Sequence, residues 1–357
     1  MSQFLNGALR RLTPYTPGEQ PRNQAYIKLN TNESPYPPSP GVLAVLNRAE
    51  GENLRLYSDP EAVELREALA ARYGVERENV FVANGSDEAL SFAFLAYAAD
   101  GRGVAFPDIS YGFYAVFARL YGIPVRQVPL RADFRLVPED YNHLHRTIVL
   151  ANPNAPTTLL QPVAAIEEVV RTNPDSIVIV DEAYIDFAGP NASCVPLTKK
   201  YDNVIVVQTF SKSHNLAGAR VGFCVANPEL IADMNRIKFS YSPYNVNSLS
   251  QAAAVAAMED ENYFRDTVGK ICATRADTMT KLRERGFTGP DSATNFLFVT
   301  TSRMPCKQIF ERLRQKGVLI RYFSAPRLSD YLRITIGTPE QMQRFFEELD
   351  LILGDTA

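Results

Sequence analysis

The stretch VIVVQTFSKSHNLAGARVG, from Val204 to Gly222, contains the pattern that best indicates the fold class of this chain. It opens with an unbroken run of β-branched residues, Val204–Val207, and a single lysine, Lys212, follows a short polar segment. Strands that are buried on both faces of a parallel sheet have such continuous Val/Ile runs. Ligands of these folds bind just beyond the carboxyl ends of the strands. We therefore expect Lys212 to lie at the edge of a binding crevice.

Three side chains around Lys212 are suited to bind a phosphate group. Thr209 and Ser211 precede the lysine and Arg220 follows it, which supplies two hydroxyls and a guanidinium. A lysine amine that is partly buried among cations forms a Schiff base with a carbonyl compound. Pyridoxal phosphate carries a carbonyl and a phosphate in one molecule, so it fits this pattern. The alternative is that Lys212 is a solvated lysine in a serine-rich loop.

The composition of the chain narrows the class of protein. The chain has 357 residues and a formal net charge of −3, which provides no basic excess for binding nucleic acid. It contains no apolar run of the roughly 20 residues that cross a membrane, and its start lacks the apolar core of a signal peptide. Four scattered cysteines and an isolated pair, His143 and His145, favour inert thiols and a surface pair over a metal site. We expect a cytoplasmic protein without metal, membrane or nucleic-acid partners.

Strand patterns alternate with helical patterns through most of the chain, which predicts the α/β class with a mostly parallel sheet. Residues 1–40, rich in Pro and Asn, are expected to form an arm that packs with the small domain or a partner subunit. Residues 41–285 are expected to form the large domain. A compositional break at Gly286–Pro290 then opens a small α+β domain, 286–357. The expected strands of the large domain are 80–83, 104–106, 125–128, 147–150, 176–180 and 204–207.

Polar residues follow two more of the expected strands. After strand 80–83, Ser86 or Asp87 is expected to cap a helix whose free N–H groups would bind an anion, although an ordinary capped helix gives the same pattern. Asp181 follows the apolar strand 176–180, where a carboxylate is costly unless a positive charge meets it. A protonated pyridine nitrogen would supply that charge, and an arginine of the protein is the alternative.

Two arginines lie on short apolar strands of the expected small domain. Arg321 and Arg333 are both in positions that suit a guanidinium poorly unless an anion is bound. That anion is either a substrate or a carboxylate of the protein itself.

Six segments occur in an order that resembles the fold type I, pyridoxal phosphate-dependent aminotransferases, and among these the histidinol-phosphate aminotransferase family most closely. They are ANGSDE, SYGFY, NPNAPT, DEAY, TFSKSHNLAGARVGF and LRITIGT, and KLNTNESPYPPSP and PYNVNSLSQAAA extend the resemblance to nearly the whole chain. It implies a homodimer that converts histidinol phosphate and 2-oxoglutarate to imidazole acetol phosphate and glutamate in histidine biosynthesis. Aromatic amino acid aminotransferases and threonine-phosphate decarboxylases share these segments and stay as alternatives.

The resemblance also implies a role for each matching residue. Lys212 holds the cofactor and moves the substrate proton, Asp181 binds the pyridine nitrogen, and Tyr184 binds the 3′-oxygen. Arg333 is expected to bind the glutamate carboxylate and Arg321 the substrate phosphate. The other implied cofactor contacts are Gly85, Ser86, Asp87, Tyr111, Asn154, Thr209, Ser211 and Arg220, with Tyr57 from the other subunit; Tyr15 and Asn32 are the other implied substrate contacts.

One loop departs from the pattern of the family. The family loop usually has an Asn that binds the 3′-oxygen at the position of Ala155, and a Gly at the position of Thr158. The 3′-oxygen is therefore expected to depend on Tyr184, with water or the amide of Asn154 as a further donor.

Overall fold

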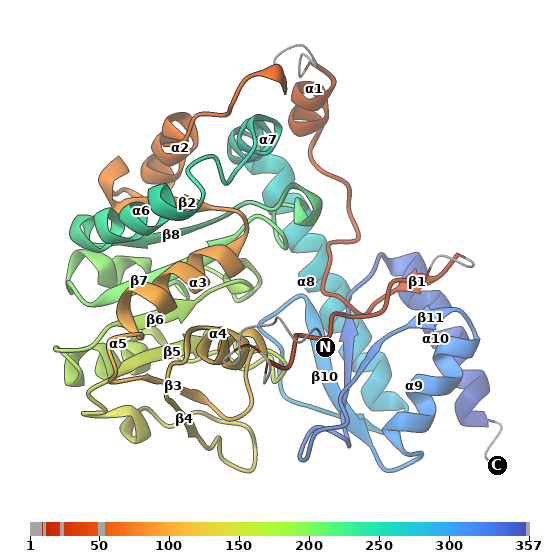
Figure 1. Cartoon of the computed structure of the whole chain (residues 1–357). Coiled ribbons are helices and arrows are strands. Elements are labelled where there is room, and N and C mark those ends of the chain that lie inside the picture. The colour runs from red at the N-terminus through yellow and green to blue at the C-terminus, as the bar shows by residue number, and fades with distance from the viewer. Residues whose placement is uncertain (1–8, 10–11, 22–24, 49–53, 355–357) are drawn as a thin grey trace.

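The computed structural model describes residues 1–357 except 1–8, 10–11, 22–24, 49–53 and 355–357. Figure 1 shows two parts. The larger part holds a sheet between layers of helices, and the smaller part contains the blue carboxyl-terminal elements. The amino-terminal segment runs across the smaller part before it reaches α1.

The large sheet has seven strands in the order β2-β8-β7-β6-β5-β3-β4. Strand β8 is antiparallel to both of its neighbours, whereas the other paired strands are parallel. The predicted α/β fold with a mostly parallel sheet is thereby confirmed. The strands are β2 (Val80–Ala83), β3 (Val104–Pro107), β4 (Val125–Val128), β5 (Thr147–Ala151), β6 (Val178–Asp181), β7 (Val204–Thr209) and β8 (Gly222–Ala226).

The continuous apolar runs arise because both faces of this sheet are covered. Successive side chains of a strand point to opposite faces. Val204 and Val206 therefore pack into one core with α1, α2, α5 and α7, and Ile205 and Val207 pack into another with α3, α4 and α6. The helices are α1 (Pro40–Arg48), α2 (Val63–Tyr73), α3 (Ser86–Tyr97), α4 (Phe113–Tyr121), α5 (Val163–Thr172), α6 (Pro228–Tyr241) and α7 (Ser248–Glu259).

The smaller part has an antiparallel sheet in the order β12-β13-β10-β9 and a separate parallel pair of β1 and β11. The arm contributes β1, and the long helix α8 contributes Ile271 and Leu282 to the core of this part. The predicted domain boundaries at residues 40 and 285 stay predictions. The elements are β1 (Ile27–Lys28), α8 (Glu261–Glu284), β9 (Phe287–Thr288), β10 (Phe296–Thr301), α9 (Cys306–Gln315), β11 (Val318–Leu319), β12 (Arg321–Tyr322), β13 (Leu332–Thr335) and α10 (Pro339–Gly354).

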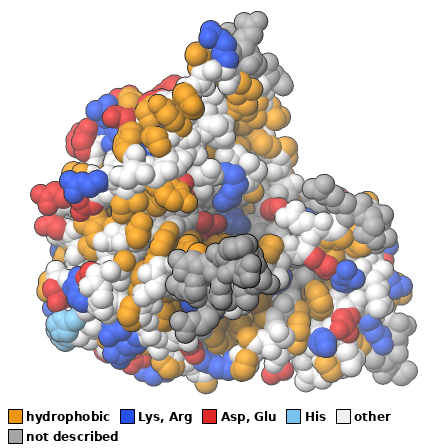
Figure 2. Space-filling view, in the orientation of Figure 1, with side chains coloured by type: hydrophobic (Ala, Val, Ile, Leu, Met, Phe, Trp, Pro, Cys, Tyr) orange, Lys and Arg blue, Asp and Glu red, His pale blue; other side chains and the backbone are white. Residues whose placement is uncertain are grey.

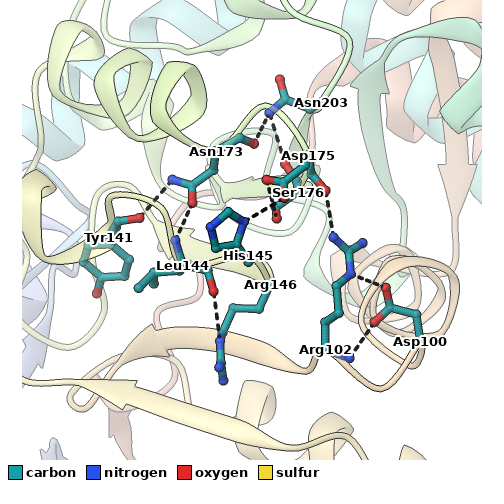
Figure 3. A network of polar contacts seen from close by, with 10 residues as sticks. All are labelled: Asp100, Arg102, Tyr141, Leu144, His145, Arg146, Asn173, Asp175, Ser176 and Asn203. Atoms are coloured by element: carbon teal, nitrogen blue, oxygen red, sulfur yellow. Dashed lines mark hydrogen bonds and ion pairs between the residues drawn. The ribbon is translucent and has the colours of Figure 1, made fainter.

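Figure 3 shows a polar network near the amino-terminal ends of β5, β6 and β7. Lys212 lies at the opposite end of these strands, because it follows the carboxyl end of β7. The N–H of Leu144 donates to Asn173 Oδ1 over 2.8 Å, and Asn203 Nδ2 donates to the carbonyl of Asn173 over 2.8 Å. At the surface, the His145 ring lies 2.8 Å from the Asp175 carboxylate. Leu144, Asn173 and Asn203 lie shortly before β5, β6 and β7, so these contacts connect the segments that lead into the three central strands.

None of the helices in the described ranges is long and apolar enough to cross a membrane. The same residues contain no group of His, Cys, Asp and Glu side chains arranged to hold a metal ion.

Candidate active site

Asp181 ends strand β6 as a buried carboxylate with only 5% of its surface exposed. The Tyr114 hydroxyl donates to Asp181 Oδ2 over 2.7 Å, and the N–H of Ala183 donates to Oδ1 over 3.1 Å. Burial raises the pKa of the Asp181 carboxyl to about 6, although both hydrogen bonds act in the opposite direction. The described residues offer it no cationic partner within ion-pair distance. Asp181 is therefore poised to bind a cationic N–H.

Lys212 follows strand β7 and is half-buried at the carboxyl edge of the sheet. Its Nζ lies 3.5 Å from the carbonyl oxygen of Thr31 and 5.7 Å from the centre of the Tyr184 ring. Burial lowers the pKa of the Lys212 amine to about 8, with Arg333 acting in the same direction and the carboxylates of Glu33 and Asp87 opposing it. A lysine in this state is readily deprotonated, as a nucleophilic amine must be.

The amino terminus of α3 faces the Ser211 and Arg220 side chains. Gly85 is the cap residue and supplies no side-chain hydrogen bond, so the prediction that Ser86 or Asp87 caps the helix is wrong. Arg220 Nη1 lies 3.4 Å from Ser211 Oγ, and Thr209 Oγ1 lies 3.0 Å from the same hydroxyl. The first-turn N–H groups, two hydroxyls and a guanidinium thus converge on one spot, which suits a phosphate dianion.

We call the α3 amino terminus at Ser86, with Thr209, Ser211 and Arg220, the cradle. Asp87 and Tyr111 border it. The Tyr111 hydroxyl donates to Asp87 Oδ1 over 2.9 Å, and Arg220 Nη2 lies 3.7 Å from Asp87 Oδ2. The structure therefore brings Gly85, Ser86, Asp87, Tyr111, Thr209, Ser211, Arg220 and Lys212 together at one edge of the sheet.

Glycine at position 222 is required for the cradle to close. A Cβ on Gly222 would lie 2.2 Å from the backbone nitrogen of Ser86, and one on Gly85, whose φ is +78°, would lie 2.4 Å from Arg220 Nη2. At Gly222 the clash is with backbone, so a side chain there forces the backbone of the cradle apart. At Gly85 the clash is with the movable end of Arg220, and the positive φ is the stronger reason for glycine.

The Gly222→Ala variant is expected to lose affinity for a phosphate-bearing cofactor by at least tenfold while it retains the fold. Gly218→Ala is the matched control, because a Cβ there meets no atom of the described residues within 4 Å. Equilibrium titration of the cofactor-free proteins measures the effect. Equal affinities for the two variants would show that α3 and β8 are not held as closely as described.

Arg333 and Arg321 occupy directly opposite positions on β13 and β12. Arg333 Nη2 donates to the carbonyl of Asn30 over 2.7 Å, but its buried Nε has no hydrogen-bond partner among the described residues. Arg321 donates to two backbone carbonyls of the arm, at 3.3 and 3.5 Å, and its guanidinium lies over the ring of Phe323. Like charges opposite each other on paired strands are destabilising. Since neither guanidinium is paired with a carboxylate in the described chain, the two together are suited to an anionic ligand.

The arm brings Tyr15 close to Tyr111 and Asn32 close to Tyr184. The Tyr15 ring lies 4.4 Å from that of Phe113 and 6.3 Å from that of Tyr111. Asn32 is buried and donates from Nδ2 to the Tyr184 hydroxyl oxygen over 2.9 Å. Figure 2 shows the surface hollowed between the two parts of the molecule, with charged side chains of both signs inside the hollow.

Asn154 lies near the site, but other groups already use its amide. Its Oδ1 accepts from Ser110 over 2.8 Å, and its Nδ2 donates to the Ile109 carbonyl and to Thr157 Oγ1 at 3.0 and 2.9 Å. The role of Asn154 as a substitute donor near Ala155 therefore stays a prediction. Thr158 adopts φ +68°, a conformation that favours the glycine usual in the family.

Tyr57 is the one predicted contact that lies away from this chain's own site. Its side chain is 82% exposed and its ring stacks on Tyr244 at 4.4 Å. The prediction that it reaches the cofactor of another subunit is compatible with this exposure and stays a prediction.

Sequence reasoning missed Tyr114, the hydrogen-bond donor to Asp181. Tyr114 lies in the first turn of α4, which begins at Phe113, and is fully buried. A signal was present, since a tyrosine on an apolar helix face needs a partner for its hydroxyl. Which carboxylate provides that partner depends on the packing of α4 against β6.

Comparison with known proteins places this geometry in a family. The model of the family "Aminotransferase class I and II" matches residues 24–349. The chain belongs to this family. A Brachyspira hyodysenteriae histidinol-phosphate aminotransferase is 45% identical to this aminotransferase over 353 residues, which cover 99% of each chain. Histidinol-phosphate aminotransferase 1 of Hydrogenovibrio crunogenus is 48% identical over 354 residues, again 99% of each chain.

A solved structure shows the same fold as this aminotransferase. The histidinol-phosphate aminotransferase of Sinorhizobium meliloti in complex with pyridoxal-5′-phosphate superposes with a TM-score of 0.89. The two chains are 24% identical, and the superposition covers 100% of this chain and 99% of the other. The resemblance found in the sequence is confirmed by these matches.

Proposed function

We propose that this aminotransferase converts histidinol phosphate and 2-oxoglutarate to imidazole acetol phosphate and glutamate, with pyridoxal 5′-phosphate as its cofactor. The observation that carries the proposal is the convergence of Lys212, buried Asp181 and the unneutralised pair Arg321 and Arg333. The full-length identity of 45% and 48% to relatives named for this activity supports it. The reaction belongs to histidine biosynthesis, and a cytoplasmic location stays a prediction from the sequence.

The residues of the site fit pyridoxal phosphate. The cradle of Ser86, Ser211 and Arg220 would hold the phosphate, and Asp181 would hold a proton on the ring nitrogen. Lys212 would join the cofactor carbonyl carbon, and Tyr184 would face the 3′-oxygen. When bound, the cofactor supplies a carbonyl carbon for the amine and a ring that accepts electrons.

The protein's own groups then perform the proton transfers. The Lys212 amine, with its lowered pKa, removes the proton from the substrate carbon that bears nitrogen and later returns a proton. Arg333 and Arg321 orient the substrate through its anionic groups. Because both substrates are anions, one pair of guanidiniums serves both halves of the reaction.

A combined spectral and kinetic experiment tests this function. The purified protein should become yellow with pyridoxal phosphate, and both glutamate and histidinol phosphate should bleach that colour. Release of CO₂ from threonine phosphate would instead indicate the decarboxylase. A preference for phenylpyruvate over imidazole acetol phosphate would indicate the aromatic aminotransferase.

Substitution of the two arginines should separate the two substrates. Arg321→Gln is expected to raise the KM for histidinol phosphate roughly 10–100-fold, the effect of losing one charged hydrogen bond. Its KM for glutamate should change less. Arg333→Gln should raise the KM for glutamate by a similar factor. Steady-state kinetics with each substrate in turn measures both values, and equal effects of both variants on both substrates would contradict the assigned roles.

We infer that the enzyme is a homodimer. Apolar side chains are exposed on α1 and the segment after it, including Leu43, Leu54, Leu56 and Tyr57 at 44, 56, 55 and 82%. Exposed apolar groups in such numbers are typical of an interface. Sedimentation equilibrium of the purified protein tests the assembly.

A further inference from the structure

Asn32 connects three segments that are distant in the sequence. It is 2% exposed and adopts the left-handed conformation, φ +57°, which asparagine tolerates better than most residues. Its N–H donates to Thr335 Oγ1 over 3.0 Å, and its carbonyl accepts from Asn295 Nδ2 over 3.1 Å. Its Oδ1 accepts from Thr335 Oγ1 over 2.9 Å, and its Nδ2 donates to Tyr184 Oη over 2.9 Å. Every polar group of this buried residue is therefore in use.

The Asn32 amide lies with its oxygen toward Thr335 and its nitrogen toward Tyr184. Thr335 Oγ1 accepts from the N–H of Asn32 and donates its own proton to the amide oxygen, so this hydroxyl is used both as acceptor and as donor. The amide nitrogen faces Tyr184, and the tyrosine oxygen is the acceptor in that contact.

The Tyr184 ring is itself held in place. It packs edge-on against Phe296 at 5.1 Å, and Lys212 Nζ lies 5.7 Å from its centre. Burial raises the pKa of the Tyr184 hydroxyl, Arg333 and the Asn32 hydrogen bond lower it, and the carboxylates of Asp181 and Asp87 raise it. A phenol that accepts one hydrogen bond still has one proton to donate.

We propose that Asn32 is a positioning residue: by donating to Tyr184 Oη, it commits the tyrosine proton to the 3′-oxygen of the cofactor. The proposal rests on the proposed function. Ala155 offers no side-chain donor at the loop position where the family has an asparagine, so the 3′-oxygen would depend more strongly on Tyr184.

The same contacts link Tyr184 to the strand that binds the substrate. Thr335 and Arg333 lie two residues apart on β13, so their side chains share one face of the strand. Arg333 also holds the carbonyl of Asn30 in the arm. A substrate carboxylate on Arg333 therefore binds to the strand and arm that orient Asn32.

The first experiment uses cofactor-free protein that carries 3-fluorotyrosine. The ¹⁹F signal of Tyr184 is assigned by its absence in Tyr184→Phe, and its pH midpoint reports the pKa of that hydroxyl. Asn32→Asp keeps the shape and replaces the donor by an acceptor, so the midpoint should rise by roughly one unit, the equivalent of one net hydrogen bond. Asn32→Gly tolerates the same φ without adding charge and should also raise it.

The second experiment follows the visible absorption of the pyridoxal phosphate-loaded protein against pH. A donor to the 3′-oxygen withdraws electron density from the neighbouring imine nitrogen. The midpoint of the absorbance change with pH, called the absorbance midpoint, should therefore lie at higher pH in Asn32→Asp and Asn32→Gly. Thr335→Val, which frees the amide to rotate, should shift it in the same direction, whereas Thr335→Ser keeps the hydroxyl and should leave the midpoint in place.

The outcomes separate the inference from the proposed function. If the wild type is yellow and transaminates but the Asn32 variants leave both midpoints unchanged, the positioning role is overturned and the function stands. If the wild type takes up no pyridoxal phosphate, the proposed function is overturned, and so is the proposed effect of Asn32 on the cofactor. Equal shifts of the absorbance midpoint in Thr335→Ser and Thr335→Val would show that the side chain of residue 335 acts through packing alone. That result would also overturn the positioning role of Asn32.

Discussion

The Lys212→Ala variant is expected to fold, to bind pyridoxal phosphate without a covalent bond, and to lose turnover. The loss should be at least the roughly 10²–10⁴-fold that a positioned acid–base group contributes. Two functions disappear together in this variant, because the same amine joins the cofactor and moves the substrate proton. Steady-state transamination and the visible spectrum of the loaded protein measure the two losses separately.

Stability should not decline with activity in this variant. Burial lowers the pKa of Lys212 to about 8. Below pH 8 the amine is charged in both states, and water solvates that charge better in the unfolded chain, so Lys212 destabilises the folded protein. Between pH 8 and 10.5 only the unfolded chain still binds the proton, so the free energy of unfolding rises with pH in this range. The cofactor-free variant should therefore melt at no lower a temperature than the wild type at pH 7.

Lys270→Ala, which removes an exposed lysine paired with Asp266, is the control for activity and should retain turnover. Substantial transamination by Lys212→Ala would refute the assignment.

The positions of Lys212 and Asp181 could be predicted because they depend on local patterns. Continuous Val/Ile runs indicate strands buried on both faces, and the residues that follow such strands meet at one edge of a parallel sheet. Strands β6 and β7 are indeed neighbours, with Asp181 opposite Val207. Two apolar runs and the rule for parallel sheets were therefore sufficient to place a lysine and an aspartate near each other.

Contacts between distant segments could not be predicted in this way. The sequence places good capping residues at Ser86 and Asp87, but the cap of α3 is Gly85, at φ +78°. A side chain at Gly85 would meet the Arg220 guanidinium, and this closeness to a residue far along the chain is not visible in the local pattern. Asn32 and Thr335 are 303 positions apart, and their contact depends on how the arm crosses the second sheet. No periodicity or motif in either segment indicates that crossing.

Asp181→Asn is the second substitution with a large expected effect. A carboxylate about 4 Å from a protonated ring nitrogen is worth about 4 kcal/mol at an effective dielectric near 20. If all of this stabilisation acts in the transition state, its loss lowers the rate roughly a thousandfold. The asparagine keeps the shape and the contacts of Tyr114 and Ala183, since a phenol accepts as well as donates. The loss should therefore come from the missing charge, and steady-state kinetics measures it.

The same variant should be more stable than the wild type when no cofactor is bound. Burial raises the pKa of Asp181 to about 6 from 3.8, so the folded protein binds the proton more tightly than the unfolded chain between these values. Stability of the wild type therefore falls as pH rises from about 4 to about 6, by about 3 kcal/mol for a shift of this size. Melting temperatures of the two cofactor-free proteins should agree near pH 4 and differ by several degrees above pH 6, with the variant higher. Saturating pyridoxal phosphate should reverse the order, because only the wild type binds the protonated ring nitrogen with a full charge. An unchanged order on adding the cofactor would show that Asp181 does not meet the ring nitrogen.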